Sequence, residues 1–533
     1  MTEQSNRSRS LVATLALVAL TALLFSRALI DGHGFVGLDD IDNLVENDGY
    51  AGLGLENLRW AFTAAHLGVY EPVSWIFRSV QHEVFGKSAF GFHAVTLLLH
   101  LANSLLVLSL ARRLLAATLP EARPGRIETG SLLAAALFAL HPLRVEVVSW
   151  ASGQPYALAT CFSLLSIRAY LGYAAAPDRT GRLVLAGLLY VLGVLSKSAV
   201  IALPLAMLLI DLLPTSWPKR SPRRVLAEKL PLFGAAVGLA WLALAATRDA
   251  QTGFVALDLT ERLARTIAAP VVYLVNTVWP VGLTAHDPVP AEGLSLTAPA
   301  TLFSAAVVVG ISLWLLARRS RRGAAVAWLA FLAVLAPVAG LLQHGAPTLS
   351  ADRYAYASMT PLAILGGAFF ARLPSLGRVH ACVAVVVLAL FGTTTWRQVG
   401  TWADTESLWN HALAIDPHNS FAGNNLGYML LSDGRLEEAA SVLERAYPFG
   451  RENEHLTLNL GYCLEQLERY YAALYHYEQA LVLHEQSPGV HNNLAVIFLH
   501  FGYPDEARIH YKRALELDPQ FAPARAGLES MQR

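Results

Sequence analysis

The chain has 533 residues, of which 54% are hydrophobic and only 15% are charged, and its 40 Lys and Arg residues are balanced by 40 Asp and Glu residues. Soluble proteins carry about 25% charged residues, so this composition indicates a membrane protein. The zero net charge offers no basic surface of the kind that duplex binding requires, and we therefore expect no nucleic acid partner.

Long apolar runs, separated by short polar connections, fill the sequence up to about Trp396. Runs of this length are what crossing a hydrocarbon core of about 30 Å requires. The sequence therefore predicts an all-α fold, in which a polytopic bundle of about eleven transmembrane helices precedes a different C-terminal region. The predicted spans are 11–30, 93–111, 130–149, 156–174, 183–196, 198–213, 231–247, 299–317, 324–342, 358–371 and 380–396.

Two of these segments differ from plain spans. The short runs on either side of Lys197 are expected to form two half-deep helices that meet at a turn, and 262–283 is expected to lie at the membrane interface or to re-enter the membrane. Not counting 262–283 leaves every basic cluster on the side of the N-terminus, which the positive-inside rule makes cytoplasmic. These clusters lie within 112–126, 179–182, 219–224, 318–322 and 372–378.

An odd number of spans then leaves the C-terminal region on the non-cytoplasmic side. We expect the first apolar run to be a retained span rather than a cleavable signal, although Ser26-Arg27-Ala28 resembles a cleavage site. The short inside connections favour a bacterial inner membrane, with the C-terminal region in the periplasm.

After Trp402 the long apolar runs stop, which predicts a membrane domain over 1–400 and a second domain over 401–533. The second region repeats with a period of about 34 residues: Asn-Leu-Gly at 425–427 returns at 459–461 and, as Asn-Leu-Ala, at 493–495. Small and large residues also recur in register. This pattern is typical of tetratricopeptide (TPR) repeats, whose paired helices stack into an α-solenoid.

The repeated asparagines Asn425, Asn459 and Asn493 are the candidate peptide-binding residues. Solenoids of this type commonly hold an extended peptide on a concave face, where amides in register can bind its backbone. The alternative is that these asparagines support turns or are simply solvated.

The segment between the first two spans, residues 31–92, is the candidate catalytic loop. It is acidic, and it places the neighbouring Asp39 and Asp40 close to the end of the first span. At a membrane surface, one such carboxylate can accept a proton from a nucleophile while its neighbour holds it in place. Aromatic residues interleave with the charges, so we expect an amphipathic cap on the membrane. The alternative is an acidic pair in a solvated turn.

Further polar residues are predicted at the outer ends of other spans, where ionisable groups are costly and tend to be paired and functional. Arginine and lysine among them could bind a lipid phosphate, with Arg supplying a bidentate fork. Membrane anchoring and salt bridges within the bundle are the alternative. The candidate substrate-binding residues are His141, Arg144, Glu146, Lys197, His286, Asp352, Arg353 and Tyr354.

The chain contains, in this order, the motifs 36–47 (VGLDDIDNLVEN), 55–62 (LENLRWAF), 71–75 (EPVSW), 140–150 (LHPLRVEVVSW), 195–204 (LSKSAVIALP), 337–343 (PVAGLLQ), 351–356 (ADRYAY) and the terminal repeats. Together these motifs resemble the transmembrane and tetratricopeptide-repeat-containing proteins, which belong to the GT-C class of membrane glycosyltransferases. The resemblance runs over nearly the whole chain, and the order of the motifs is more specific than any one of them.

The resemblance implies a transferase that moves a sugar from a polyprenyl-phosphate carrier to a protein hydroxyl on the non-cytoplasmic side, and mannose is the sugar attributed to eukaryotic members. It also implies that Asp39 is the general base and Asp40 its supporting carboxylate. The chain departs from the family at 153–156, where Gly-Gln-Pro-Tyr replaces a charged stretch, and this departure bears on which sugar or carrier is recognised.

We expect a single inverting displacement, in which Arg353 and Lys197, with Arg144 or His141 as further candidates, stabilise the departing phosphate. No cofactor is predicted. A divalent metal beside Asp39 is left out because no second set of carboxylate ligands is evident. The competing hypothesis is a non-enzymatic membrane scaffold that recruits partner proteins through its repeats. A transporter lacks support, because no inverted repeat is visible.

Overall fold

The computed structural model describes residues 3–247, 257–289, 294–342, 348–373 and 378–532, and these residues are almost entirely helical or in connections between helices. Gln343, the last residue of one of the motifs, lies outside the described residues. Internal contacts divide the chain into two compact units, one extending to Asp404 and the other beginning at Thr405.

The helices of the first unit follow the apolar runs of the sequence. Their bounds are α1 (Glu3–Phe25), α5 (Ala89–Thr118), α6 (Pro124–Ala139), α7 (Val145–Ser149), α8 (Gln154–Ala174), α9 (Gly181–Ser196), α10 (Leu203–Ile210), α11 (Pro222–Thr247), α13 (Pro299–Leu316), α14 (Arg322–Leu335), α15 (Asp352–Ser358), α16 (Thr360–Arg372) and α17 (Arg378–Thr401).

Among the described residues, 7 helices are long and apolar enough to cross a membrane, and the pairs α6–α7 and α15–α16 pass the same test as bent spans. Two shorter apolar helices, Gly181–Ser196 and Ser198–Ile210, match the remaining two predicted runs. The first unit therefore contains several helices of the length and composition that crossing a membrane requires. The count of about eleven crossings stays a prediction, because the short helices do not reach the length that a full span requires.

Proline explains the two bends. Pro142 follows the end of α6 and Pro361 lies in the first turn of α16, and the helix axes bend there by 60° and 54°. Proline has no N–H to donate and its ring clashes with the preceding turn, so the helix is interrupted. The chain is also extended at Lys197, between α9 and the short turn η4 (Ser198–Val200) that leads to α10.

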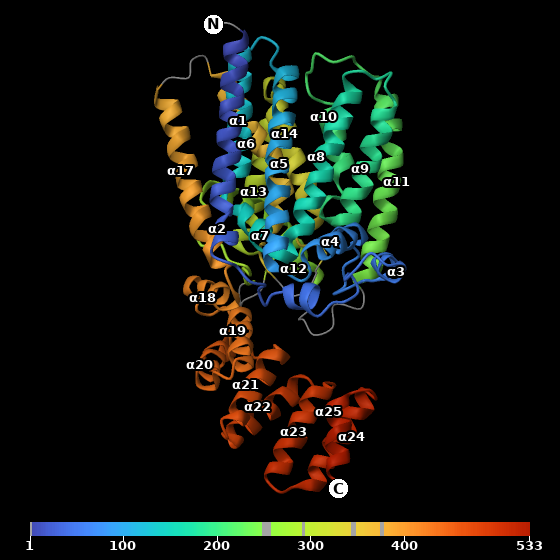
Figure 1. Cartoon of the computed structure of the whole chain (residues 1–533), viewed down its shortest axis with the longest axis vertical. Helices are drawn as coiled ribbons and strands as arrows, with labels where there is room; N and C mark the ends of the chain where they lie inside the picture. The colour runs from blue at the N-terminus through green and yellow to red at the C-terminus, as the bar shows by residue number, and fades with distance from the viewer. Residues whose placement is uncertain (1–2, 248–256, 290–293, 343–347, 374–377, 533) are drawn as a thin grey trace. The chain divides into compact units, whose positions relative to one another are not determined.

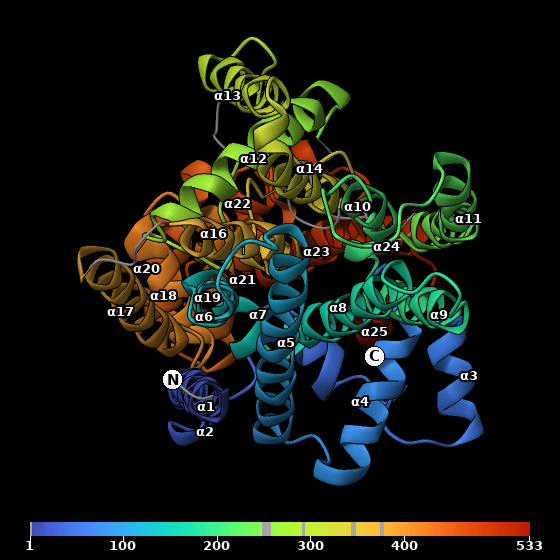
Figure 2. The same ribbon diagram turned by 90° about the horizontal axis from the view of Figure 1, so that it is seen from above.

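One end of the first unit carries the N-terminus and the connections α5–α6 and α10–α11, which bear basic clusters (Figure 1). The opposite end carries α2 (Arg27–Ile30), α3 (Leu55–Thr63), α4 (Pro72–Phe85) and α12 (Leu259–Val278). In the view from above, α12 lies across the unit rather than along the spans (Figure 2). It begins with a capping box between Asp258 and Glu261, and it is not among the candidate spans found in the described chain.

The segment between α2 and α5 forms a packed cap on the first unit. The π-helical turn η1 (Ile41–Val45) and the helices α3 and α4 contribute to a small core that also includes residues of α5 and of the turn after α7. Its buried members are Leu44, Tyr50, Ala61, Trp75, Phe92 and Ala151.

The second unit is a stack of helix pairs in which small residues permit close crossing. A Cβ atom added to Gly461 would lie 2.3 Å from the ring of Tyr477, and one added to Gly427 would lie 2.4 Å from Leu443. The helices are α18 (Thr405–Ile415), α19 (Ser420–Ser432), α20 (Leu436–Ala446), α21 (Glu454–Gln466), α22 (Tyr470–Leu483), α23 (Pro488–His500), α24 (Pro504–Leu517) and α25 (Ala522–Ser530).

Candidate active site at the helix breaks

Asp40 anchors the acidic loop to the membrane domain. Its carboxylate is fully buried and accepts hydrogen bonds from the backbone N–H of Val36 at 3.0 Å and of Ser152 at 2.8 Å. Burial raises the pKa of Asp40, while the hydrogen bonds from Ser152 and Val36 and the charge of Arg78 oppose this shift. The turn after α7 and the loop before η1 are thereby held together, which fixes the backbone of the neighbouring Asp39.

Asp39 lies beside two cations that come from distant parts of the chain. It is half-buried, and burial raises the pKa of its carboxyl from 3.8 to about 6. Arg353 and Lys197 are close enough to lower this pKa, while Asp40 and Asp42 raise it. A carboxylate with such a pKa is mostly ionised at neutral pH yet binds a proton more readily than a solvated one, which suits a general base.

Both cations are held by buried carboxylates. The Lys197 Nζ atom donates to Glu71 Oε2 at 2.7 Å, and Glu71 also contacts Arg78 at 3.4 Å. Arg353 pairs with Glu146 on α7 through its guanidinium, and its backbone N–H donates to the same carboxylate at 2.8 Å. Glu71 and Glu146 therefore orient the two cations.

A cleft of about 830 Å³ opens beside these groups. Lys197, Tyr156 and Tyr354 line it, together with residues of the outer loop around Gly68 and of the end of α11. The Lys197 ammonium lies 5.1 Å from the centre of the Tyr156 ring. A second space of about 270 Å³ shares Tyr156 and Tyr354 with this cleft and adds Arg353.

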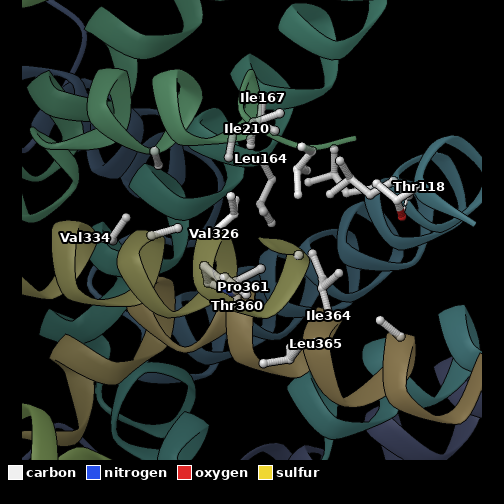
Figure 3. A pocket seen from close by; sticks show the side chains of 18 of the residues that line it. Thr118, Leu164, Ile167, Ile210, Val326, Val334, Thr360, Pro361, Ile364 and Leu365 are labelled. Carbon is white, nitrogen blue, oxygen red and sulfur yellow. Dashed lines mark hydrogen bonds between the residues drawn. The ribbon is translucent and has the colours of Figure 1, made fainter. Parts of the chain in front are cut away.

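A larger apolar cleft continues from the second space into the bundle. It has a volume of about 1180 Å³ and shares Thr160, Val200, Val334 and Ala357 with that space. Figure 3 shows side chains from α5, α8, α10, α14 and α16 around it, and most of those labelled are aliphatic. The apolar cleft among these helices thus shares part of its wall with the space that Arg353 lines.

Other predicted residues have different surroundings. His141 accepts from the N–H of Leu143 at 3.2 Å, and its other ring nitrogen lies 2.9 Å from the carbonyl of Thr277. Arg144 is buried, donates to the carbonyl of Ala355 at 2.7 Å, and lies over the ring of Phe138. Both side chains brace the broken helices, and neither is close to Asp39 in the interactions that the described residues show.

Asp352 and His286 are both buried. Asp352 starts α15 and lies in electrostatic range of Arg144 and Glu146. The residue after His286, Asp287, accepts from the Ser350 hydroxyl at 2.7 Å, so this segment supports the chain just before α15. No group of three His, Cys, Asp or Glu side chains among the described residues has an arrangement that could hold a metal ion.

The three repeat asparagines are engaged within the solenoid. The Asn425 amide donates to the carbonyl of Phe421 at 2.8 Å, and the Asn459 amide donates to Asn424 Oδ1 at 2.9 Å. Asn493 accepts from Asn492 at 3.1 Å. These bonds leave part of each amide's hydrogen-bonding capacity, so the peptide-binding role stays a prediction.

Glu71, Arg78 and Tyr156 are not among the site residues that the sequence predicts. Glu71 and Tyr156 nevertheless lie in the 71–75 motif and in the departure at 153–156. In that departure, Gln154 forms a reciprocal amide pair with Gln81 at 2.7 and 2.9 Å, whereas Tyr156 faces the cleft. Only the fold distinguishes the buried amide from the tyrosine that lines the site.

Comparison with known proteins assigns the second unit. Residues 453–520 match the family model described as tetratricopeptide repeat. The C-terminal unit is a TPR domain. Protein O-mannosyl-transferase Tmtc2 of Drosophila melanogaster is 42% identical over 64 residues, which is 12% of this chain and 7% of that protein. The chain therefore matches only a small part of the length of this curated relative.

Solved structures with similar helices include MamA, with 19% identity over 22% of this chain and 70% of that chain and a TM-score of 0.22. The first TPR domain of Spaghetti (RPAP3), bound to an HSP90 peptide, has 19% identity over 22% of this chain and 93% of that chain, with a TM-score of 0.21.

Proposed function

We propose that the protein is a membrane glycosyltransferase that moves a sugar from a polyprenyl-phosphate carrier to a Ser or Thr hydroxyl of a protein on the non-cytoplasmic side. The observation that carries this proposal is the position of Asp39 beside Arg353 and Lys197, two cations that line spaces next to an apolar cleft. The partial match to an O-mannosyltransferase supports mannose as the first sugar to test.

The reaction needs one base and a stabilised leaving group. Asp39 accepts the proton of the acceptor hydroxyl as its oxygen attacks the anomeric carbon. The bond from that carbon to the phosphate oxygen breaks, and the electron pair leaves with the polyprenyl phosphate. Arg353 and Lys197 stabilise the charge that grows on this phosphate, because preorganised cations in a poorly hydrated site lower the transition-state energy most. The outcome is inversion at the sugar.

The clefts suit the two chemical parts of this donor. The apolar cleft between α5, α8, α10, α14 and α16 accommodates a hydrocarbon chain, whose burial is favourable in proportion to its area. The cleft that Lys197, Tyr156 and Tyr354 line would take the phosphate and the sugar. Tyr156 and Tyr354 offer aromatic faces and hydroxyl groups to the sugar at the outer cleft.

The TPR domain would recruit the acceptor polypeptide, with Asn425, Asn459 and Asn493 as candidate contacts. We place the reaction at the periplasmic face of a bacterial inner membrane, in agreement with the distribution of basic clusters. No cofactor is included in this mechanism.

The test is transfer from a panel of polyprenyl-phosphate sugars to a Ser- and Thr-containing peptide by the purified chain. We expect Asp39→Asn to abolish transfer while the fold is retained. Asp48→Asn is the matched control, because Asp48 lies in the same acidic loop but is exposed and pairs with Lys87 at 2.7 Å. Unchanged transfer by Asp39→Asn would refute the mechanism, and absence of transfer by the wild type with every donor would leave a scaffold as the better account.

A further inference from the structure

A buried arginine on α12 has no counter-charge among the residues that the structure describes. Arg265 is only 5% exposed, and within the same residues its Nε atom has no hydrogen-bond partner. The titratable groups that face it from the packed elements are Tyr354, Tyr273 and Arg353. Tyrosine is neutral at pH 7 and Arg353 is another cation. In the described parts of the chain, then, no carboxylate compensates Arg265.

The backbone is shaped to admit this side chain. Gly340, which follows the short turn η6 (Ala336–Val338), has φ +125°, a conformation that L side chains rarely adopt. A Cβ atom there would lie 2.7 Å from Cδ and Cγ of Arg265 and 3.0 Å from Nε. Glycine at 340 therefore provides the space through which Arg265 extends toward Tyr354.

The other cations of the site are already paired. Lys197 contacts Glu71, and Arg353 contacts Glu146. Burial of an unpaired charge is among the most unfavourable arrangements in a protein, and burial lowers the pKa of the Arg265 guanidinium. A bound anion beside Tyr354 and Arg353 would compensate the charge of Arg265 and remove the energetic cost of burying it.

We propose that Arg265 binds an anionic phosphate oxygen of a membrane lipid, on the side of Tyr354 where Arg353 also lies. This inference rests on the proposed function insofar as the lipid is the polyprenyl-phosphate donor. The planar guanidinium can donate two parallel hydrogen bonds to a phosphate, which an ammonium cannot do. Helix α12 also supports the site through Tyr273, whose hydroxyl exchanges 3.0 Å hydrogen bonds with the backbone of Ala351.

The experiment measures thermal unfolding of the full-length chain in phospholipid-free detergent, titrated with sugar-free polyprenyl monophosphate. We expect Arg265→Gln to weaken the apparent affinity at least about tenfold, since a charge-assisted hydrogen bond is lost. Its unfolding temperature without ligand should be equal to or higher than that of the wild type, because an uncompensated charge is removed. Arg265→Lys should bind with intermediate affinity.

Arg262→Gln is the matched control on the same helix. Arg262 is half-buried and its Nε atom donates to the Leu257 carbonyl at 2.8 Å, so we expect lower stability and unchanged affinity. Parallel titrations with phosphatidylglycerol and with inorganic phosphate separate the sources. If Arg265→Gln weakens binding of polyprenyl phosphate alone, the ligand of Arg265 is the donor lipid. If it weakens binding of phosphatidylglycerol in the same way, the ligand is a phospholipid headgroup.

Equal affinity of the wild type and Arg265→Gln for both lipids would overturn the inference. A lower unfolding temperature of unliganded Arg265→Gln would also overturn it, because it would indicate a structural role for Arg265. Dependence on Arg265 for inorganic phosphate alone would also contradict a lipid ligand. A wild type that binds polyprenyl phosphate through Arg265 but transfers no sugar refutes only the proposed function. If the wild type transfers sugar but Arg265→Gln binds polyprenyl phosphate with unchanged affinity, only this inference is refuted.

Discussion

Asp39→Asn should increase the stability of the protein at neutral pH although it abolishes sugar transfer. In the folded chain, burial raises the pKa of this carboxyl from 3.8 to about 6, even though Arg353 and Lys197 oppose the shift. A tenfold change in ionisation corresponds to about 1.4 kcal/mol, so the ionised carboxylate costs the folded state about 3 kcal/mol above pH 6. Asparagine carries no charge at any pH and avoids this cost.

The stability that Asp39→Asn gains over the wild type depends on pH. The pKa of Asp39 is higher in the folded than in the unfolded chain, so its contribution to wild-type stability falls as pH rises from 3.8 toward about 6. Above that pH this contribution stays constant. The difference between Asp39→Asn and the wild type should therefore be about 3 kcal/mol near pH 7.5 and about 1 kcal/mol near pH 4.5. Comparison at the same pH removes the contribution of all other groups.

Denaturant-induced unfolding of both chains in detergent, at the two pH values, measures this difference. Asp48→Asn serves again as the control and should show no such gain, because Asp48 is exposed and Lys87 lowers its pKa. Lower stability of Asp39→Asn near pH 7.5, or a gain of the same size at both pH values, would contradict a carboxylate held in a poorly solvated site.

The remaining predictions concern catalysis and packing. The value of kcat/KM should rise with pH through about 6 and be flat above, since the Asp39 base must be ionised; a profile without this inflection contradicts the assignment. Lys197→Met should destabilise the chain by about 3 kcal/mol, because Glu71 loses the closer of its two cationic partners. In a double-mutant cycle, adding Glu71→Gln should recover part of this stability. Gly367→Leu should impair folding of the membrane domain, measured as the monodisperse fraction in detergent, because a Cβ there lies 2.2 Å from the Gly130 carbonyl oxygen. Gly461→Val should destabilise only the TPR domain by about 2 kcal/mol through overpacking, which domain-resolved hydrogen exchange will detect.

Some elements of this molecule could be predicted because their signals are local. Helices α5 and α17 contain the whole of the apolar runs 93–111 and 380–396 and extend beyond them by at most seven residues. The turn at Lys197 interrupts apolar periodicity within a few residues, and the TPR helices repeat their small and large positions in register. In each case the relevant energies, hydration of apolar side chains and backbone hydrogen bonding, depend on neighbours in the chain. The sequence predicts 130–149 as one span, whereas the structure bends this segment by 60° at Pro142.

The membership of the candidate site was predictable only in part. The positions of Asp39, Lys197 and Arg353 at the ends of spans predict site residues, and in the structure both cations lie in electrostatic range of Asp39. Glu146 is predicted on the same ground and pairs with Arg353. Arg144 and His141, predicted in the same way, form contacts with the carbonyls of Ala355 and Thr277, and their role in substrate binding stays a prediction. Sequence position gives the depth of a side chain in the membrane but not the direction in which it points.

Apolar helices followed by TPR repeats can be predicted from the chain alone, since hydropathy and periodicity are properties of consecutive residues. Which charges meet depends on the three-dimensional fold: Glu71 binds Lys197 across 126 positions, and Arg265 has no carboxylate partner among the described residues. The energy of a charge depends on its distance from other charges and from water in three dimensions. That distance is set by how the helices pack and where their breaks fall, which no local pattern specifies.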